Sequence, residues 1–136
     1  MLEKILCVDD DPITVMLCRK VVSKSDFAKV TDSAQNGEEA LRYFDQLMMN
    51  NSTDYPELIL LDLNMPVMGG WEFLDNFSKE MYTKYFTGIK VIVLSSTIDP
   101  QDVEKSRSYE MVLDFMSKPI TTDMLEKLKA SLVNSK

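Results

Sequence analysis

Residues 58–66, with the sequence Leu-Ile-Leu-Leu-Asp-Leu-Asn-Met-Pro, decide the fold of this chain of 136 residues. The first four residues are all branched and apolar, without the alternation of a half-exposed strand, which is typical of a strand buried on both faces of a sheet. The apolar run ends at Asp62, and Pro66 follows soon after. A carboxylate directly after a buried strand indicates that this edge of the sheet carries polar chemistry.

Four further stretches predict strands of the same sheet. The short apolar runs 5–8, 91–94 and 113–116 also lack alternation, so we expect each to be buried on both faces. The segment 29–34, which leads into Asn36-Gly37, predicts the remaining strand. The chain therefore contains five strands that are far apart in sequence, as in a parallel sheet.

Segments with helical spacing lie between these strands, and several begin with a recognisable start signal. The signals are Pro12 after an acidic run, Asn36 with Glu39 three residues on, Asp99 before Pro100, and Thr121-Thr122 ahead of Leu125. Alternating strands and helices predict an α/β fold: a five-stranded parallel sheet, doubly wound as (βα)5 and flavodoxin-like. We expect a single domain over residues 1–136, because no linker or repeat interrupts the pattern.

Composition excludes several classes of function. The net charge of −7 does not supply the basic face that nucleic acid requires, and the apolar run 5–8 is too short for a signal peptide or a membrane span. The sequence has no His, which excludes Ser-His and Cys-His nucleophile pairs and His metal ligands. Cys7 and Cys18 both lie in apolar stretches, where reduced thiols pack well. We therefore expect a cytoplasmic protein that binds neither nucleic acid nor membrane.

Polar side chains follow four of the five predicted strands, and together they suit the transfer of a phosphoryl group. They are Asp9, Asp10 and Asp11 after the first strand, Asp62 after the third, Ser95, Ser96 and Thr97 after the fourth, and Lys118 after the fifth. Carboxylates gathered at adjacent strand ends repel one another unless a cation joins them, and Mg²⁺ prefers such oxygen ligands. Lys118 can hold a phosphoryl oxygen or pair with Asp62, and Ser95 offers a hydroxyl donor. An aspartate that attacks phosphorus needs positioning and charge neutralisation more than acid-base help, which suits a site without His.

Four runs in this order resemble the receiver domain of bacterial two-component response regulators. They are Ile-Leu-Cys-Val-Asp-Asp-Asp-Pro at 5–12, the run 58–66 followed by Gly69-Gly70, Val-Ile-Val-Leu-Ser-Ser-Thr at 91–97, and Phe-Met-Ser-Lys-Pro at 115–119. The match spans essentially the whole chain, which is most similar to stand-alone, chemotaxis-type receivers without an output domain. The resemblance implies a response regulator that accepts a phosphoryl group from a sensor histidine kinase or a histidine phosphotransfer protein. It also implies an unidentified downstream target, and either a monomer or a phosphorylation-dependent dimer.

The resemblance also implies a role for each site residue. Asp62 would be the phosphoacceptor, and Ser95 and Lys118 would contact the phosphoryl group. Ser95 and Phe115 would form the switch. Mg²⁺, for which Mn²⁺ could substitute, would be bound by Asp9, Asp10, Asp62 and the backbone carbonyl of Asn64; Pro119 would follow Lys118 through a cis peptide bond. Such a protein is no enzyme beyond its own phosphorylation and dephosphorylation.

Two positions depart from the commonest pattern of the family. Phe115 stands where Tyr is more frequent, so no ring hydroxyl can form a hydrogen bond and the switch would depend on ring burial. Gly69 stands where Asp or Asn often precedes the glycine, which would loosen the loop after Asp62.

The same residues allow other interpretations. Phosphatases of the haloacid-dehalogenase type need an Asp two residues after the nucleophile, where this chain has Asn64, and the chain has no glycine-rich nucleotide-binding motif. A receiver that is never phosphorylated and serves only as an interaction module is the remaining alternative. Asp11 is expected to cap a helix and Ser96 to be a loop residue. Trp71 either anchors the third helix or faces a partner.

Overall fold

Five parallel strands form one sheet in the computed structural model, which describes residues 1–134. They are β1 (Leu2–Val8), β2 (Ala28–Ala34), β3 (Leu58–Asp62), β4 (Lys90–Ser95) and β5 (Val112–Ser117). The strand order is β2-β1-β3-β4-β5, and every neighbouring pair is parallel. The predicted doubly wound, flavodoxin-like α/β fold is confirmed. Residues 135–136, which the expected single domain was to include, lie outside the described residues.

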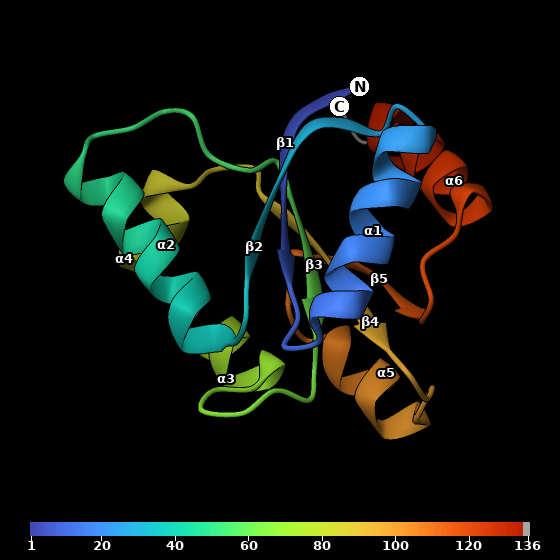
Figure 1. Cartoon of the computed structure of the whole chain (residues 1–136). Coiled ribbons are helices and arrows are strands. Elements are labelled where there is room, and N and C mark those ends of the chain that lie inside the picture. The colour runs from blue at the N-terminus through green and yellow to red at the C-terminus, as the bar shows by residue number, and fades with distance from the viewer. Residues whose placement is uncertain (135–136) are drawn as a thin grey trace.

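Helices cover both faces of the sheet. They are α1 (Pro12–Lys24), α2 (Gly37–Met49), α3 (Gly70–Phe77), α4 (Glu80–Tyr85), α5 (Pro100–Ser106) and α6 (Thr122–Asn134). Figure 1 shows α1 and α6 on one side of the sheet and α2, α3 and α4 on the other. Within residues 1–134, no helix combines the length and the apolar character needed to cross a membrane.

The predicted helix start signals cap the helices in the expected way. At each of four positions a side-chain oxygen accepts a hydrogen bond from a backbone N–H two or three residues later. The pairs are Asp11 with Ile13 (3.0 Å), Asn36 with Glu39 (2.9 Å), Asp99 with Gln101 (2.9 Å) and Thr121 with Met124 (3.2 Å). These local bonds fix where α1, α2, α5 and α6 begin, and so fix the loops that join them to the strands.

The sheet separates two hydrophobic clusters. Successive residues of a strand point to opposite faces, so Leu6 packs toward α2 and α3 whereas Ile5 and Cys7 pack toward α1 and α6. The first cluster is rich in aromatic rings, among them Phe44 and Phe77, whose centroids are 4.5 Å apart. Each buried aromatic or aliphatic side chain contributes about 1.5–3 kcal/mol, so the two clusters hold the strand ends rigidly in register.

Strand β5 is the edge strand beyond β4, and its burial differs from the prediction. Residues 113–116 do form a strand, but the expectation that it is buried on both faces is wrong. Leu113 is 36% exposed, Asp114 is exposed, and Phe115 is only half-buried. The reason is its place in the sheet: β5 pairs with β4 alone, so it lacks the second flanking strand that β3 and β4 have.

Helix α4 was not predicted from the sequence. It is only six residues long, a length at which a helix gains little from its own hydrogen bonds. Contacts with distant segments stabilise it: the Tyr82 hydroxyl donates to Asp45 of α2 at 2.7 Å, and the Tyr85 hydroxyl donates to the Ser52 carbonyl at 2.7 Å. Tertiary packing, which has no local sequence signal, accounts for this helix.

Candidate functional site

The carboxyl ends of four neighbouring strands bring the predicted site residues together. Asp9 and Asp10 follow β1, Asp62 ends β3, Ser95 ends β4, and Lys118 follows β5. Because the strands are parallel and adjacent, their carboxyl ends share one edge of the sheet, which lies toward the lower side of the view in Figure 1. Every residue to which the sequence assigned acid, hydroxyl or ammonium chemistry therefore belongs to a single site.

Three carboxylates form the centre of this site. One oxygen each from Asp9, Asp10 and Asp62 lies within 4.8 Å of the other two. Asp9 is 4% exposed and Asp62 is 7% exposed, whereas Asp10 is exposed. Asp11, next along the chain, accepts from Thr14 as well as Ile13 and acts as the expected helix cap. The acidic group is thus open to solvent on the side of Asp10 and enclosed on the side of Asp62.

Lys118 supplies the positive charge of the site. Its ammonium lies 2.6 Å from Asp9 Oδ2 and 3.2 Å from Asp62 Oδ1. The expected pairing with Asp62 is therefore present, but the shorter contact is with Asp9, which the sequence did not predict. The Lys118 backbone N–H donates to the Ser95 carbonyl at 2.8 Å, and the peptide bond from Lys118 to Pro119 is cis, as the resemblance implied.

Burial and neighbouring charges shift two pKa values in this group. Burial raises the pKa of Asp62; Lys118 opposes this and Asp9 adds to it, and the pKa remains above its ordinary value. Burial lowers the pKa of Lys118, but the hydrogen bond with Asp9 and the charges of Asp62 and Asp9 outweigh that effect, so this pKa is also raised. Lys118 therefore stays charged at neutral pH, and three carboxylates face one ammonium.

The ligand atoms available here fit a hard divalent cation. Mg²⁺ takes oxygen ligands, commonly one or two carboxylates together with water and a phosphate, and a partly open acidic group offers this set. The backbone N–H of Asn64 forms a hydrogen bond with Asp62, so the chain turns closely around this carboxylate. Asn64 itself is exposed beside the site. Its predicted role, as a carbonyl ligand, stays a prediction.

Ser95 and Phe115, the two expected switch residues, lie on the adjoining strands β4 and β5. Ser95 is 3% exposed, and its hydroxyl oxygen accepts a hydrogen bond from the Thr97 backbone N–H at 3.3 Å. Phe115 is opposite Val93 in the strand pairing and packs, half-buried, against the aromatic cluster. The switch roles expected for Ser95 and Phe115 stay predictions.

The loop after Asp62 is held by its backbone. The Gly70 N–H donates to the Leu63 carbonyl at 3.0 Å, and the Met68 carbonyl accepts from Gly37 at 2.8 Å. A Cβ on Gly70 would lie 2.7 Å from the Asp62 carbonyl oxygen, so only glycine allows α3 to start this close to Asp62. Gly69 gives α3 no side-chain cap, and the expectation that it loosens the loop stays a prediction.

The cavity at the site is small. It has a volume of about 60 Å³ and is lined in part by Asp9, Asp62, Lys118 and Cys18. Pockets that enclose small-molecule ligands measure about 300–1,000 Å³, so this cavity is too small to enclose such a ligand. A larger hollow, of about 580 Å³, lies near Tyr55 and Ile89 at the other end of the sheet, far from the carboxylates.

One cluster near the site was missed by sequence reasoning. Trp71 of α3 stacks on Tyr109, with ring centroids 5.7 Å apart, and Lys105 of α5 lies 4.9 Å from the centroid of the Trp71 ring. The expectation that Trp71 anchors the third helix agrees with this packing. Nothing in the local sequence around Tyr109 or Lys105 indicates the contact, because the residues come from separate elements.

Comparison with known proteins points to one family. The sequence model described as the response regulator receiver domain matches residues 5–129. The two-component response regulator ARR17 of Arabidopsis thaliana is 33% identical over 135 residues, which cover 96% of this chain and 84% of that protein. Among solved structures, a two-component response regulator from Cytophaga hutchinsonii has a TM-score of 0.88 at 28% identity, and the match covers 98% of each chain.

A longer relative matches over only part of its length. The protein-glutamate methylesterase/protein-glutamine glutaminase of Methanococcoides burtonii is 28% identical over 131 residues, which are 96% of this chain but 34% of that protein. The chain thus spans about a third of this relative, whose named activity belongs to the longer protein.

Proposed function

Because the chain belongs to the response regulator receiver domain family of two-component systems, we propose that it is a phosphorylation switch whose phosphoacceptor is Asp62. The observation that carries the proposal is the placement of Asp62. Its carboxylate is buried at a strand end, lies among two further carboxylates, and contacts the Lys118 ammonium at 3.2 Å. A structural ion pair would balance its charges. Here three carboxylates surround one ammonium, so the negative charge exceeds the positive charge.

Asp62 would attack the phosphorus atom of a phosphohistidine on a sensor kinase or a phosphotransfer protein. The new bond joins a carboxylate oxygen to phosphorus, the bond from phosphorus to the histidine nitrogen breaks, and that nitrogen keeps the electron pair. Lys118, 3.2 Å from Asp62, and Ser95, at the end of the adjacent strand β4, would hold the phosphoryl oxygens. Mg²⁺, or Mn²⁺ in its place, would be held by Asp9, Asp10, Asp62 and the Asn64 carbonyl and would neutralise charge during transfer.

The signal would then pass from Ser95 to the surface of the molecule. Ser95 moves toward the phosphoryl group, the loop that leads into α5 follows, and Phe115 fills the space that this leaves. The surface made by α5, β5 and α6 changes as a result. Turning a population from about 1% active to about 99% active needs roughly 5.5 kcal/mol, which a few charge-assisted hydrogen bonds can provide.

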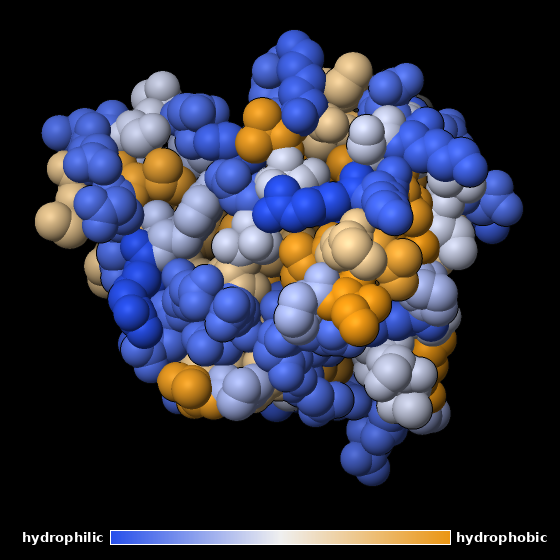
Figure 2. All heavy atoms as spheres, in the orientation of Figure 1, coloured by the Kyte–Doolittle hydropathy of each residue, from blue (hydrophilic) through white to orange (hydrophobic). Residues whose placement is uncertain are grey.

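The partner that donates the phosphoryl group would dock beside the site. Ile13, Met16 and Leu17 of α1 are 64%, 48% and 45% exposed, and Figure 2 shows a hydrophobic patch over this helix. Exposed apolar side chains next to a reactive centre suit a protein partner better than a small molecule. A cytoplasmic, non-enzymatic receiver that acts on a downstream protein, as a monomer or a phosphorylation-dependent dimer, is the function that we propose.

The test is the intact mass of the protein after incubation with acetyl phosphate and Mg²⁺. We expect the wild type to gain one phosphoryl group, and we expect no gain for Asp62→Ala or when EDTA is added. If the wild type gains no mass under any of these conditions, the phosphorylation switch is wrong and the chain acts as an unmodified interaction module. Ser95→Ala is expected to accept the phosphoryl group but to lose its effect on partner binding.

A further inference from the structure

Trp71, the only tryptophan of the chain, joins α3 to the connection between α5 and β5. Its ring and that of Tyr109 are stacked, with the planes 16° from parallel and the centroids 5.7 Å apart. The Lys105 ammonium lies 4.9 Å from the centroid of the Trp71 ring, within reach of a cation–π interaction. We refer to Trp71, Asp75, Lys105 and Tyr109 together as the α3–α5 clamp.

The Tyr109 hydroxyl gives the clamp a defined geometry. It donates to Asp75 Oδ1 at 2.5 Å, and Asp75 is one helical turn after Trp71, on the same side of α3. Burial and the carboxylate of Asp75 raise the pKa of Tyr109 to about 12, so the hydroxyl remains a donor at neutral pH. The Tyr109 backbone also bonds to Ser106 at the end of α5 and to Val112 at the start of β5. The position of this ring therefore follows the carboxyl end of α5.

On its other side the clamp is fixed to the acceptor strand. Gly70, the residue before Trp71, packs against the Asp62 carbonyl so closely that a Cβ would lie 2.7 Å away, and its N–H donates to Leu63. The first turn of α3 therefore cannot shift far relative to Asp62. Through Trp71 and Tyr109, the strand that carries the acceptor is tied to the far end of α5.

We propose that the α3–α5 clamp holds α5 in its unphosphorylated position and so limits how fast Asp62 takes up a phosphoryl group. This inference rests on the proposed function, in which the loop after Ser95 moves and pulls on the amino end of α5. The clamp restrains the carboxyl end of the same helix. If only the conformation with α5 displaced reacts, the observed phosphorylation rate is proportional to the population of that conformation. Loosening the clamp increases this population and so raises the phosphorylation rate. Trp71, Lys105 and Tyr109 are positioning residues, since none of them touches the phosphoryl group.

The experiment measures the rate at which acetyl phosphate, with Mg²⁺, phosphorylates each variant, by intact mass. Tyr109→Phe keeps the stacked ring and removes the hydrogen bond to Asp75, and Lys105→Gln removes the charge beside Trp71. We expect Tyr109→Phe to react about fivefold faster than the wild type, the population change that corresponds to one hydrogen bond of about 1 kcal/mol. Lys105→Gln is expected to react faster by a smaller factor.

Matched controls separate this effect from a general loss of stability. Tyr85→Phe also removes a tyrosine hydroxyl bond, to the Ser52 carbonyl, and Lys84→Gln also removes a helical lysine charge, paired with Glu80. Both lie on α4, away from the clamp, and we expect their rates to stay within about twofold of the wild type. Faster reaction of the clamp variants alone supports the proposal, whereas equal or slower reaction overturns it.

Fluorescence of Trp71 provides a second readout of the same clamp. Its emission is expected to change when the wild type is phosphorylated, because Tyr109 and Lys105 then move away from the ring, and unchanged emission would overturn the proposal. If the wild type is phosphorylated while the clamp variants behave like it, only the clamp is wrong. If the wild type is not phosphorylated at all, the proposed function fails and the clamp with it.

Discussion

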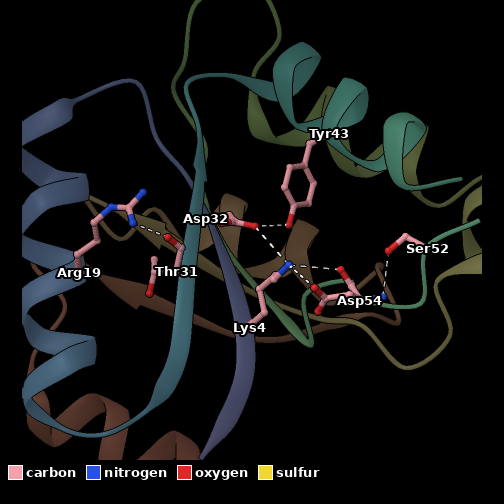
Figure 3. Close-up of polar contacts among 7 residues, drawn as sticks. All are labelled: Lys4, Arg19, Thr31, Asp32, Tyr43, Ser52 and Asp54. Carbon is pink, nitrogen blue, oxygen red and sulfur yellow. Dashed lines mark hydrogen bonds and ion pairs between the residues drawn. The ribbon is translucent and has the colours of Figure 1, made fainter. Parts of the chain in front are cut away.

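Two clusters in this molecule place one lysine between two aspartates, but they differ in the burial of the aspartates and in charge balance. In the site cluster, Lys118 contacts Asp9 and Asp62, with Asp10 nearby. In the peripheral cluster, Lys4 of β1 lies 3.7 Å from Asp32 and 3.1 Å from Asp54. Figure 3 shows the peripheral cluster, with Tyr43 of α2 pointing toward Asp32.

The two clusters differ in the burial of their carboxylates. The lysine side chains are similarly covered, 18% exposed for Lys118 and 15% for Lys4. The aspartate side chains are 4% and 8% exposed in the site cluster, but 36% and 78% exposed in the peripheral cluster. Water screens the charges of exposed carboxylates, whereas buried ones depend on the protein or on a bound cation.

The two clusters also differ in their charge balance. The peripheral cluster is completed by a neutral donor, because the Tyr43 hydroxyl bonds to Asp32 at 2.7 Å. In the site cluster the further group is a third carboxylate, Asp10. A lysine–aspartate contact alone therefore does not mark a functional site. What marks it is the gathering of two buried aspartates and a third carboxylate around a single ammonium.

Replacing the lysine of each cluster should give the largest difference between them, measured as the rate at which Asp62 is phosphorylated. Lys118→Met should slow phosphorylation of Asp62 by acetyl phosphate by about 100-fold or more, because a positioned charge that stabilises a transition state contributes on that scale. Lys4→Met, the matched control, should leave the rate within about twofold, because its ion pairs are largely exposed. Rates from intact mass decide between them, and equal losses in both variants would mean that Lys118 has no special role.

Magnesium should stabilise one cluster and not the other. With Mg²⁺ at about a hundred times its dissociation constant, the free energy of unfolding should rise by about 2.7 kcal/mol, provided that only the folded state binds the ion. Asp9→Asn should reduce this gain and Asp32→Asn should not. Denaturant unfolding at several Mg²⁺ concentrations measures the effect; a gain that Asp9→Asn leaves intact would place the ion elsewhere.

The raised pKa of Asp62 predicts that the stability of the protein depends on pH. A carboxyl group with a higher pKa in the folded protein stabilises that state while protonated. This contribution is complete below the ordinary value of 3.8 and is lost as the pH rises through the folded pKa. In EDTA at pH 7, Asp62→Asn should therefore have a higher free energy of unfolding than the wild type.

The same comparison at acid pH provides the control. The advantage of Asp62→Asn should shrink as the pH falls and be smallest below 3.8, where the wild-type carboxyl is protonated in both states. Denaturant unfolding of both proteins at each pH gives the difference. An advantage that does not change with pH would show that packing, not ionisation, is its cause.

The smallest effect is expected at Tyr43, in the peripheral cluster. Tyr43→Phe removes the hydroxyl that donates to Asp32 and should lower the free energy of unfolding by about 1 kcal/mol. The phosphorylation rate should not change, because the bond between Tyr43 and Asp32 only joins α2 to β2. Thermal or denaturant unfolding, together with the mass assay, tests both statements, and a slower phosphorylation rate would contradict the distinction between the clusters.

The sequence predicted those parts of the fold that depend on near neighbours along the chain. Apolar runs such as 58–61 and caps such as Asn36 act within a few residues, so the central strands and most helix starts could be predicted. The exposure of Leu113 and the formation of α4 could not be predicted. They depend on which strand is at the edge of the sheet and on contacts made by Tyr82 and Tyr85 with segments more than thirty residues away.

The candidate site divides in the same way. The sequence by itself determined which residues meet, because parallel strands bring their carboxyl ends to one edge, and so it placed Asp9, Asp62, Ser95 and Lys118 together. Only the tertiary structure decided that Lys118 contacts Asp9 more closely than Asp62, and that Trp71 is packed against Tyr109. The physical reason is one of distance. The residue sequence of a strand determines which residue stands at its carboxyl end. The distance between two side chains at that edge, to within an ångström, depends on packing across the whole core.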